Sequence, residues 1–398
     1  MTQVENYKNI LESIFHKTIT FSNDSIENNC IGALNRIDDF HVFRANFIER
    51  LKRLNEYFKD SPAIIDEIIK TAKQIAQKKG YKWSGSYSEL VALDYWIQFK
   101  DLTNIKFPDK NNTATFTDSI ARQIGNQEID LDISLDLTSK RIYSDVKSLI
   151  PTHTELVDQI LDKLESQFVT KNFLIGIDNI YDVDYLRIKS DYIYELQSGN
   201  LIQKLTEAIN SLNTSYTHIL QSGESANFRI SYARDGKNTA LQTMREMEPY
   251  KLAVDYKYKI LDYYEKLLIS EPSLITFVAN PWFNQELNPF DDFVPTFYRA
   301  LARRIFMELT KDSTDMGTIY PKLQGKNIKI SDVAEIITGI IFINDRSVTK
   351  SDGEIYDTFI YLNPNATNKK LSRRDFDILK WSHRIKQPFI DEFYYDNY

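Results

Sequence analysis

Carboxylates at alternate positions mark one segment of the chain, "EIDLDISLDLTSKRIYSDVKSL" at residues 128–149. Glu128, Asp130, Asp132 and Asp136 share the even positions there with one serine, and isoleucines and leucines lie between them. A period of two is typical of a half-buried β-strand, whose polar side chains share one face. A solvated face usually mixes charges, whereas carboxylates in a row repel one another. We therefore expect a positive group beside this face.

The second half of the segment predicts a hairpin partner in which Tyr143, Asp145 and Lys147 share one face. If an even-length loop forms at "SK" or "TSKR", each residue of the first strand pairs with the residue of the second strand that brings the sum of their numbers to 279. The two polar faces then lie on the same side of the hairpin. This register pairs Asp136 with Tyr143, Ser134 with Asp145, and Asp132 with Lys147. Asp132 would then lie diagonally from Asp145, at a separation that a divalent cation could bridge through oxygen ligands.

Two ordinary structural explanations compete with this chemistry. Asp145 and Lys147 could be an exposed pair on an edge strand, a common outcome for so short a motif. Upstream, "SYSE" has the form of a capping box, with Ser86 as N-cap and Glu89 three residues later. Glu89 also borders an apolar helical stripe of Ala92, Leu93 and Trp96, where an unpaired charge would be costly.

The order of these residues resembles the PD-(D/E)XK nuclease superfamily, which includes many restriction endonucleases and the archaeal Holliday-junction resolvases. Its pattern is an acid on a helix, an Asp on a strand, and (Asp/Glu)-x-Lys ending the next strand. Glu89, then Asp132 or Asp130, then Asp145 and Lys147 match these positions. The resemblance covers roughly residues 80–177. The chain lacks a proline before the first Asp and has Asp rather than the commoner Glu at position 145.

This resemblance implies a Mg²⁺-dependent endonuclease that cleaves DNA, such as a restriction or phage-defence enzyme, with Mn²⁺ as a substitute metal. The metal ligands would be Asp132, Asp145 and Glu89, with Asp130 as a further candidate. Lys147 would orient or deprotonate the attacking water and contact the phosphate. The alternatives are a nucleic-acid- or protein-binding module on a nuclease-like fold that does not cut, and a metal-dependent hydrolase of a small phosphoester.

The elements that would position these residues form an α/β fold, with a restriction-endonuclease-like mixed sheet flanked by helices. Apolar residues at helical spacing predict a helical region over residues 1–80. A core follows at 81–365, beginning β-β-β-α-β with "ATFTDSI", the hairpin and "NFLIGI". We interpret about 180–270 as a large insertion, after which "SLITFVA", "TGIIFIND" and "TFIYL" complete the same sheet; a separate second domain fits almost as well.

The net charge of −7 requires that any polyanion bind to a segregated basic surface. Two stretches qualify: residues 68–88, with five lysines and no acid, and residues 369–386, with seven Lys or Arg against two Asp. The second belongs to the predicted basic tail, 366–398, which could equally be a solvated C-terminal helix. The expected DNA-binding side chains are Lys78, Lys79, Lys82, Lys369, Lys370, Arg373 and Arg374.

Cysteine usage and hydropathy bound the location of the protein. Cys30 is the single cysteine, which excludes an internal disulfide and fits a reducing compartment. The longest apolar runs are too short to span a bilayer. We therefore expect a cytoplasmic protein with no membrane partner, and a homodimer is left open.

Overall fold

The structure is a computed structural model, and it divides into two compact units. The first comprises Met1–Leu149 and Ile260–Tyr398, and the second comprises Ile150–Lys259. The described residues are 2–21, 30–35, 37–78, 82–99, 102–107, 113–114, 127–128, 131–137, 140–149, 160, 163–164, 167, 173–178, 200–211, 215–219, 225–234, 249–264, 266–267, 271–281, 293–350, 355–367, 371 and 375.

Five helices begin the first unit: α1 (Gln3–Phe15), α2 (Cys30–Asn35), α3 (Ile37–Tyr57), α4 (Pro62–Gln77) and α5 (Trp83–Trp96). Helix α4 shows why this region folds as the sequence predicts. Its buried residues, among them Ile65, Ile68, Ala72 and Ile75, recur at helical spacing and form one apolar face. Helix α5 is buried along almost its whole length, because α4 covers one side of it and the sheet covers another.

A six-stranded sheet forms the centre of the first unit, and its spatial order β1-β4-β5-β9-β10-β11 follows the chain. The strands are β1 (Leu102–Lys106), β4 (Ile133–Leu137), β5 (Lys140–Ser148), β9 (Ser273–Ala279), β10 (Ile337–Asp345) and β11 (Tyr356–Leu362). Strands β5, β9 and β10 are mutually parallel, and the other neighbours pair antiparallel. The sheet is therefore mixed, and the three late apolar runs complete it as predicted.

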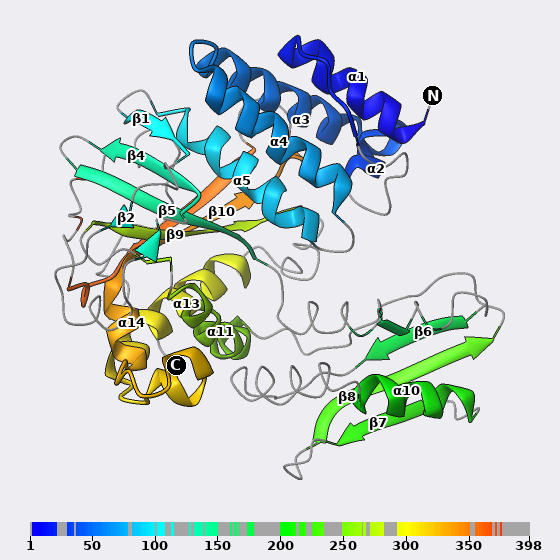
Figure 1. Cartoon of the computed structure of the whole chain (residues 1–398), viewed down its shortest axis with the longest axis vertical. Helices are drawn as coiled ribbons and strands as arrows, with labels where there is room; N and C mark the ends of the chain where they lie inside the picture. The colour runs from blue at the N-terminus through cyan, green and yellow to red at the C-terminus, as the bar shows by residue number, and fades with distance from the viewer. Residues whose placement is uncertain are drawn as a thin grey trace. The chain divides into compact units, whose positions relative to one another are not determined.

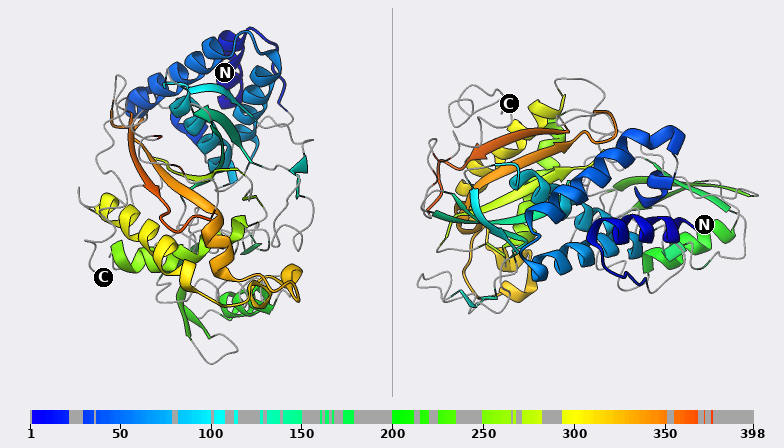
Figure 2. Two further views of the ribbon diagram at one scale, coloured as in Figure 1. Left: turned by 90° about the vertical axis from the view of Figure 1, so that its left-hand side faces the viewer. Right: turned by 90° about the horizontal axis from the view of Figure 1, so that it is seen from above.

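Helices cover both faces of this sheet, as Figures 1 and 2 show. On one face the Tyr298 ring of α13 (Phe293–Met307) stacks on Phe342 of β10 at 4.3 Å between centroids. On the other face the Tyr87 hydroxyl of α5 donates a 2.6 Å hydrogen bond to Asp345 of the same strand. Every residue of β9 and β10 is buried, which explains why these strands lack polar alternation.

Short elements complete the first unit. The chain runs from α13 to α14 (Ile330–Ile336) through the 3₁₀ turns η4 (Leu309–Lys311), η5 (Met316–Thr318) and η6 (Pro321–Leu323). A two-stranded sheet joins β2 (Thr113–Ala114) to β3 (Gln127–Glu128). Of the predicted strand "ATFTDSI" only Ala114 is described, and it pairs with Gln127 in this small sheet; residues 115–120 lie outside the described part of the chain, and β1 is the strand that pairs with β4.

The second unit contains its own antiparallel sheet in the order β6-β8-β7. Its described elements are β6 (Phe173–Asp178), α10 (Asn200–Asn210), β7 (Ser215–Ile219), β8 (Ser225–Arg234) and α11 (Pro249–Lys257). The prediction that "NFLIGI" is a core strand was wrong, because β6 pairs with β8. An apolar run identifies a strand, but not the sheet that it joins. The chain returns to the first unit within the 3₁₀ turn η3 (Tyr258–Tyr263).

Candidate active site

Asp145 and Lys147 lie on the sheet face that α13 covers. In the parallel register Asp145 pairs with Ile275 and Lys147 with Phe277, and Phe277 pairs in turn with Phe342, on which α13 packs. Strand β5 is internal, with β4 on one side and β9 on the other. The explanation of Asp145 and Lys147 as an exposed edge pair is therefore wrong, since Asp145 is fully buried and Lys147 is only partly exposed.

Two lysines approach the same oxygen of the buried Asp145 carboxylate. The Nζ atom of Lys147 donates a 2.8 Å hydrogen bond to Oδ1, and the Nζ atom of Lys266 lies 3.6 Å from Oδ1. Oδ2 is also buried but has no hydrogen-bond partner among the described residues. A buried carboxylate oxygen without a partner is costly, and such atoms call for a functional explanation.

The electrostatic environment of Asp145 raises the pKa of its carboxyl from 3.8 to about 7. Burial is the largest cause because it penalises the charged form, and the neighbouring Asp132 carboxylate adds to the increase. Lys147 and Lys266 act in the opposite direction. A carboxyl group with a pKa in this range is typical of catalytic and metal-binding positions, although ion-pair networks can produce one too.

The hairpin register differs from the prediction by two residues. Strand β4 ends at Leu137 and β5 begins at Lys140, so the paired numbers add up to 277 rather than 279. Ser134 therefore pairs with Tyr143, and Asp136 with Arg141. The predicted even parity is correct, so the polar faces do meet. Because the loop begins one residue earlier than the predicted "SK", Asp132 comes to the level of Asp145 rather than that of Lys147.

Asp132 lies at the point where the β4 ladder ends. Its backbone N–H donates to the Ser144 carbonyl, and its Oδ2 accepts a 2.7 Å hydrogen bond from the backbone N–H of Val146. The side chain thus adds a hydrogen bond to β5 directly before β4 begins. This bond holds one carboxylate oxygen of Asp132 at the peptide that joins Asp145 to Val146, close enough for its charge to act on the Asp145 carboxyl.

Of the other acidic residues of the predicted stripe, Glu128 and Asp136 are not part of this group. Glu128 belongs to β3, in the separate two-stranded sheet, and Asp130 lies outside the described residues. Asp136 forms two hydrogen bonds with the Arg141 guanidinium, at 2.8 and 3.0 Å, and this contact is the main cause of its lowered pKa. The expected positive partners are therefore Arg141 for Asp136, and Lys147 with Lys266 for Asp145.

Glu89 starts from the opposite side of the sheet, because α5 packs on the face that carries Asp345. Its helix begins at Trp83, so Ser86 is not an N-cap, and the capping-box explanation is wrong. Ser86 is buried instead, and its hydroxyl donates to Gln74 and accepts from Lys78. Within the described part of the chain, no group of three or more His, Cys, Asp or Glu side chains could hold a metal. Glu89 as a third ligand stays a prediction.

Two carboxylates are nevertheless compatible with Mg²⁺. This ion commonly keeps several water ligands and binds one or two protein carboxylates together with substrate phosphates. The buried Oδ2 of Asp145, without a hydrogen-bond partner among the described residues, and the nearby Asp132 carboxylate supply hard oxygen donors of the kind that this ion prefers. Asp132 and Asp145 are thus the candidate metal ligands that the described contacts bring together.

The predicted DNA-binding lysines are only partly described. The Nζ atom of Lys78 donates a 3.0 Å hydrogen bond to Ser86, which joins α4 to α5, and Lys82 is exposed. Lys79, Lys369, Lys370, Arg373 and Arg374 lie outside the described residues. Their role in binding stays a prediction.

Sequence reasoning missed Lys266 and Tyr263. The Lys147 ammonium lies 4.9 Å from the centroid of the Tyr263 ring, a cation–π distance. Both residues follow the second unit in the chain, more than 110 positions after Lys147. The Tyr-rich segment around them carries no motif that would have identified them.

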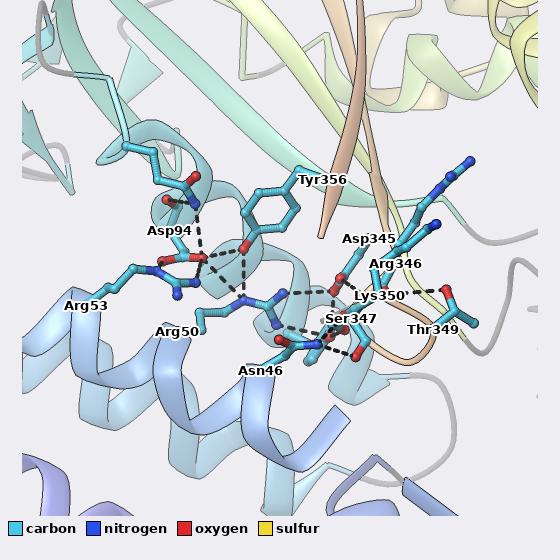
Figure 3. A network of polar contacts seen from close by, with 12 residues as sticks. Asn46, Arg50, Arg53, Asp94, Asp345, Arg346, Ser347, Thr349, Lys350 and Tyr356 are labelled. Atoms are coloured by element: carbon cyan, nitrogen blue, oxygen red, sulfur yellow. Dashed lines mark hydrogen bonds and ion pairs between the residues drawn. The ribbon is translucent and has the colours of Figure 1, made fainter. Parts of the chain in front are cut away.

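A second polar cluster lies on the α5 face and is centred on Arg50 of α3 (Figure 3). Its guanidinium donates to Tyr356, Tyr87 and Asp345 at 3.0 to 3.1 Å. Arg53 binds both oxygens of the buried Asp94, at 2.9 and 2.7 Å. Two arginines thus balance two aspartates, and the cluster joins α3, α5, β10 and β11. We interpret it as a structural network.

Searches against protein-family models, curated proteins and solved structures found no match to the chain. Among the described residues, no helix is long and apolar enough to cross a membrane.

Proposed function

We propose that the protein is a divalent-metal-dependent endonuclease that hydrolyses phosphodiester bonds in DNA, as a restriction or phage-defence enzyme would. The observation that carries the proposal is the buried Asp145 carboxylate, which has Lys147 on one oxygen and no hydrogen-bond partner on the other among the described residues. Asp145 is buried, one of its oxygens has no hydrogen-bond partner among the described residues, and Lys147 offsets only part of its charge. With a second carboxylate nearby, such a group is better suited to bind a cation than to stabilise the fold.

The order of elements supports the same proposal. Helix α5 with Glu89 precedes β4, Asp132 lies directly before β4, and Asp145-x-Lys147 lies in β5. This is the order on which the resemblance to the PD-(D/E)XK superfamily rests. Lys147 and Asp145 point to one face of an internal strand, as residues two apart in a strand do.

Each side chain has a distinct task in this proposal. Asp145 and Asp132 would hold Mg²⁺, which supplies charge neutralisation at the scissile phosphate and an activated water. Lys147 would orient the attacking water or a phosphate oxygen as a point charge. Its contact with the Tyr263 ring and its bond to Asp145 hold the ammonium at the position where β5 ends.

Cleavage of supercoiled plasmid DNA with Mg²⁺ or Mn²⁺ tests the proposal. The purified protein should cut, whereas Asp145→Ala and Lys147→Ala should not, and Asp132→Asn should be strongly impaired. Asp136→Asn is the matched control and should cut normally, because Arg141 already neutralises that carboxylate on the same strand pair. Calorimetry should show that metal binding is lost mainly in Asp145→Ala.

Retained cutting by both Asp145→Ala and Lys147→Ala would contradict the assignment. Tight DNA binding by the wild-type protein without any cutting would instead support a binding module on this fold. Hydrolysis of a small phosphoester, with no action on DNA, would support the phosphoester hydrolase.

A further inference from the structure

Two lysines from distant parts of the chain meet at one buried carboxylate. Lys147 comes from β5, whereas Lys266 comes from the turn that follows η3, after the chain has returned from the second unit. Tyr263, three residues before Lys266, lies under the Lys147 ammonium. The segment from Tyr263 to Lys266 thus supplies both a second cation, Lys266, and the aromatic ring that contacts the Lys147 ammonium.

The two ammonium groups are held differently. Lys147 makes a hydrogen bond of 2.8 Å to Asp145, whereas Lys266 at 3.6 Å is beyond hydrogen-bond distance and is attracted by charge. The side chains are 20% and 28% exposed, so both lysines reach from the buried carboxylate toward solvent.

The charge of the group indicates which anion that would be. Asp132 and Asp145 are balanced by Lys147 and Lys266, so the four side chains together carry no net charge when ionised. A bound divalent cation would leave the group with an excess of two positive charges. A phosphodiester carries one negative charge, and more negative charge accumulates on the reacting phosphate during hydrolysis. With Lys147 alone, only one excess charge would be present.

We propose that Lys266 is a second phosphate-binding cation of this site, which engages the same phosphate group of a nucleic-acid substrate as Lys147. This inference rests on the proposed nuclease function and deepens it, because the residue lies outside the motif on which that function was proposed. The competing explanation is that Lys266 serves only as a counter-ion for the buried Asp145.

Substrate binding separates the two explanations. We would measure the fluorescence anisotropy of a labelled DNA duplex across a salt series, with Ca²⁺ in place of Mg²⁺, for the wild type, Lys266→Ala and Lys266→Arg. Lys311→Ala is the matched control, since it removes an equal charge from an exposed site in the same unit. Each phosphate contact contributes about 0.9 to the log–log salt slope.

Lys266→Ala should lower that slope by about 0.9 and weaken binding about tenfold, the usual scale of a charge-assisted hydrogen bond. Lys266→Arg should restore both values, and Lys311→Ala should change neither. Steady-state cutting in Mg²⁺ should show a lower kcat/KM for Lys266→Ala, again restored by Arg. Calorimetric metal binding should be retained in Lys266→Ala, since Asp132 and Asp145 remain.

An unchanged slope and affinity in Lys266→Ala would overturn the proposal and leave a counter-ion role, while the nuclease function would still stand on the Asp145 and Lys147 variants. A wild-type protein that neither binds nor cuts nucleic acid would overturn both.

Discussion

Replacement of Asp145 by Asn should stabilise the metal-free protein at alkaline pH. The carboxyl has a pKa of about 7 in the folded protein, against an ordinary value of 3.8. The folded state therefore keeps a proton between these values that the unfolded chain has already released. Stability contributed by this group is present at low pH and is lost as the pH rises from about 4 to about 7.

The size of the effect follows from the same two values. One pH unit corresponds to about 1.4 kcal/mol, so ionising the buried carboxyl costs about 4 kcal/mol of folding free energy above pH 7. Asp145→Asn keeps the shape of the side chain and removes its titration. The variant should exceed the wild type by only about 1 kcal/mol at pH 4.5 and by about 4 kcal/mol at pH 8.

Urea unfolding in EDTA, followed by tryptophan fluorescence, measures this difference. Trp83 and Trp96 are buried in α5 of the first unit, so their signal reports on the unit that holds the site. Asp136→Asn is the control of opposite sign. Arg141 lowers the pKa of Asp136, so that carboxylate stabilises the folded state above about pH 4, and its removal should reduce stability at pH 8.

Metal addition gives the second half of the test. A ligand that binds only the folded state at one hundred times its Kd adds about 2.7 kcal/mol. Mg²⁺ should stabilise the wild type at pH 8 and leave Asp145→Asn unchanged. An Asp145→Asn variant that is no more stable than the wild type at pH 8, or that keeps its full advantage at pH 4.5, would refute a raised pKa of Asp145.

Two further substitutions test the scaffold. Arg50→Met should lower the free energy of unfolding by about 3 to 5 kcal/mol, because it leaves the buried Asp345 without its cation, whereas Arg53→Met at the partly exposed end of the network should cost less; urea denaturation compares the two. Gly339→Ala should cost about 1 to 3 kcal/mol, since a Cβ there would lie 2.9 Å from the backbone oxygen of Tyr361, and a thermal melt that matches the wild type would contradict this packing argument.

The sequence predicted the strands better than their partners. Apolar runs identified β9, β10 and β11 because strands buried on both faces are nearly continuous in hydrophobic residues. The same kind of run at β6 was assigned to the wrong sheet, because an apolar run does not record which sheet a strand joins. Topology depends on contacts between distant segments, and local periodicity does not record them.

The hairpin shows the same limit at finer scale. Alternation correctly predicted which residues of β4 and β5 share a face. The loop was placed one residue too late, but its even length was correct, so the predicted faces still meet. The register itself depends on which two residues make the turn, and several polar residues around Ser139 could do so. A shift of two residues keeps every side chain on its face, yet it decides whether Asp132 stands level with Lys147 or with Asp145.

The parallel pairing of β5 with β9 explains why Lys266 and Tyr263 were not predicted from the sequence. Two parallel neighbours need a crossover connection, and here the crossover contains the whole second unit. Lys147 lies two residues before the chain leaves the first unit at Leu149, and Tyr263 lies three residues after it returns at Ile260. Lys147 from one end of this crossover and Tyr263 from the other thus contact each other, and Lys147 binds Asp145. The residues around Asp145 come from two segments of the first unit, one before and one after the inserted second unit. A sequence motif that lies entirely in the first of these segments can therefore identify only the residues of that segment.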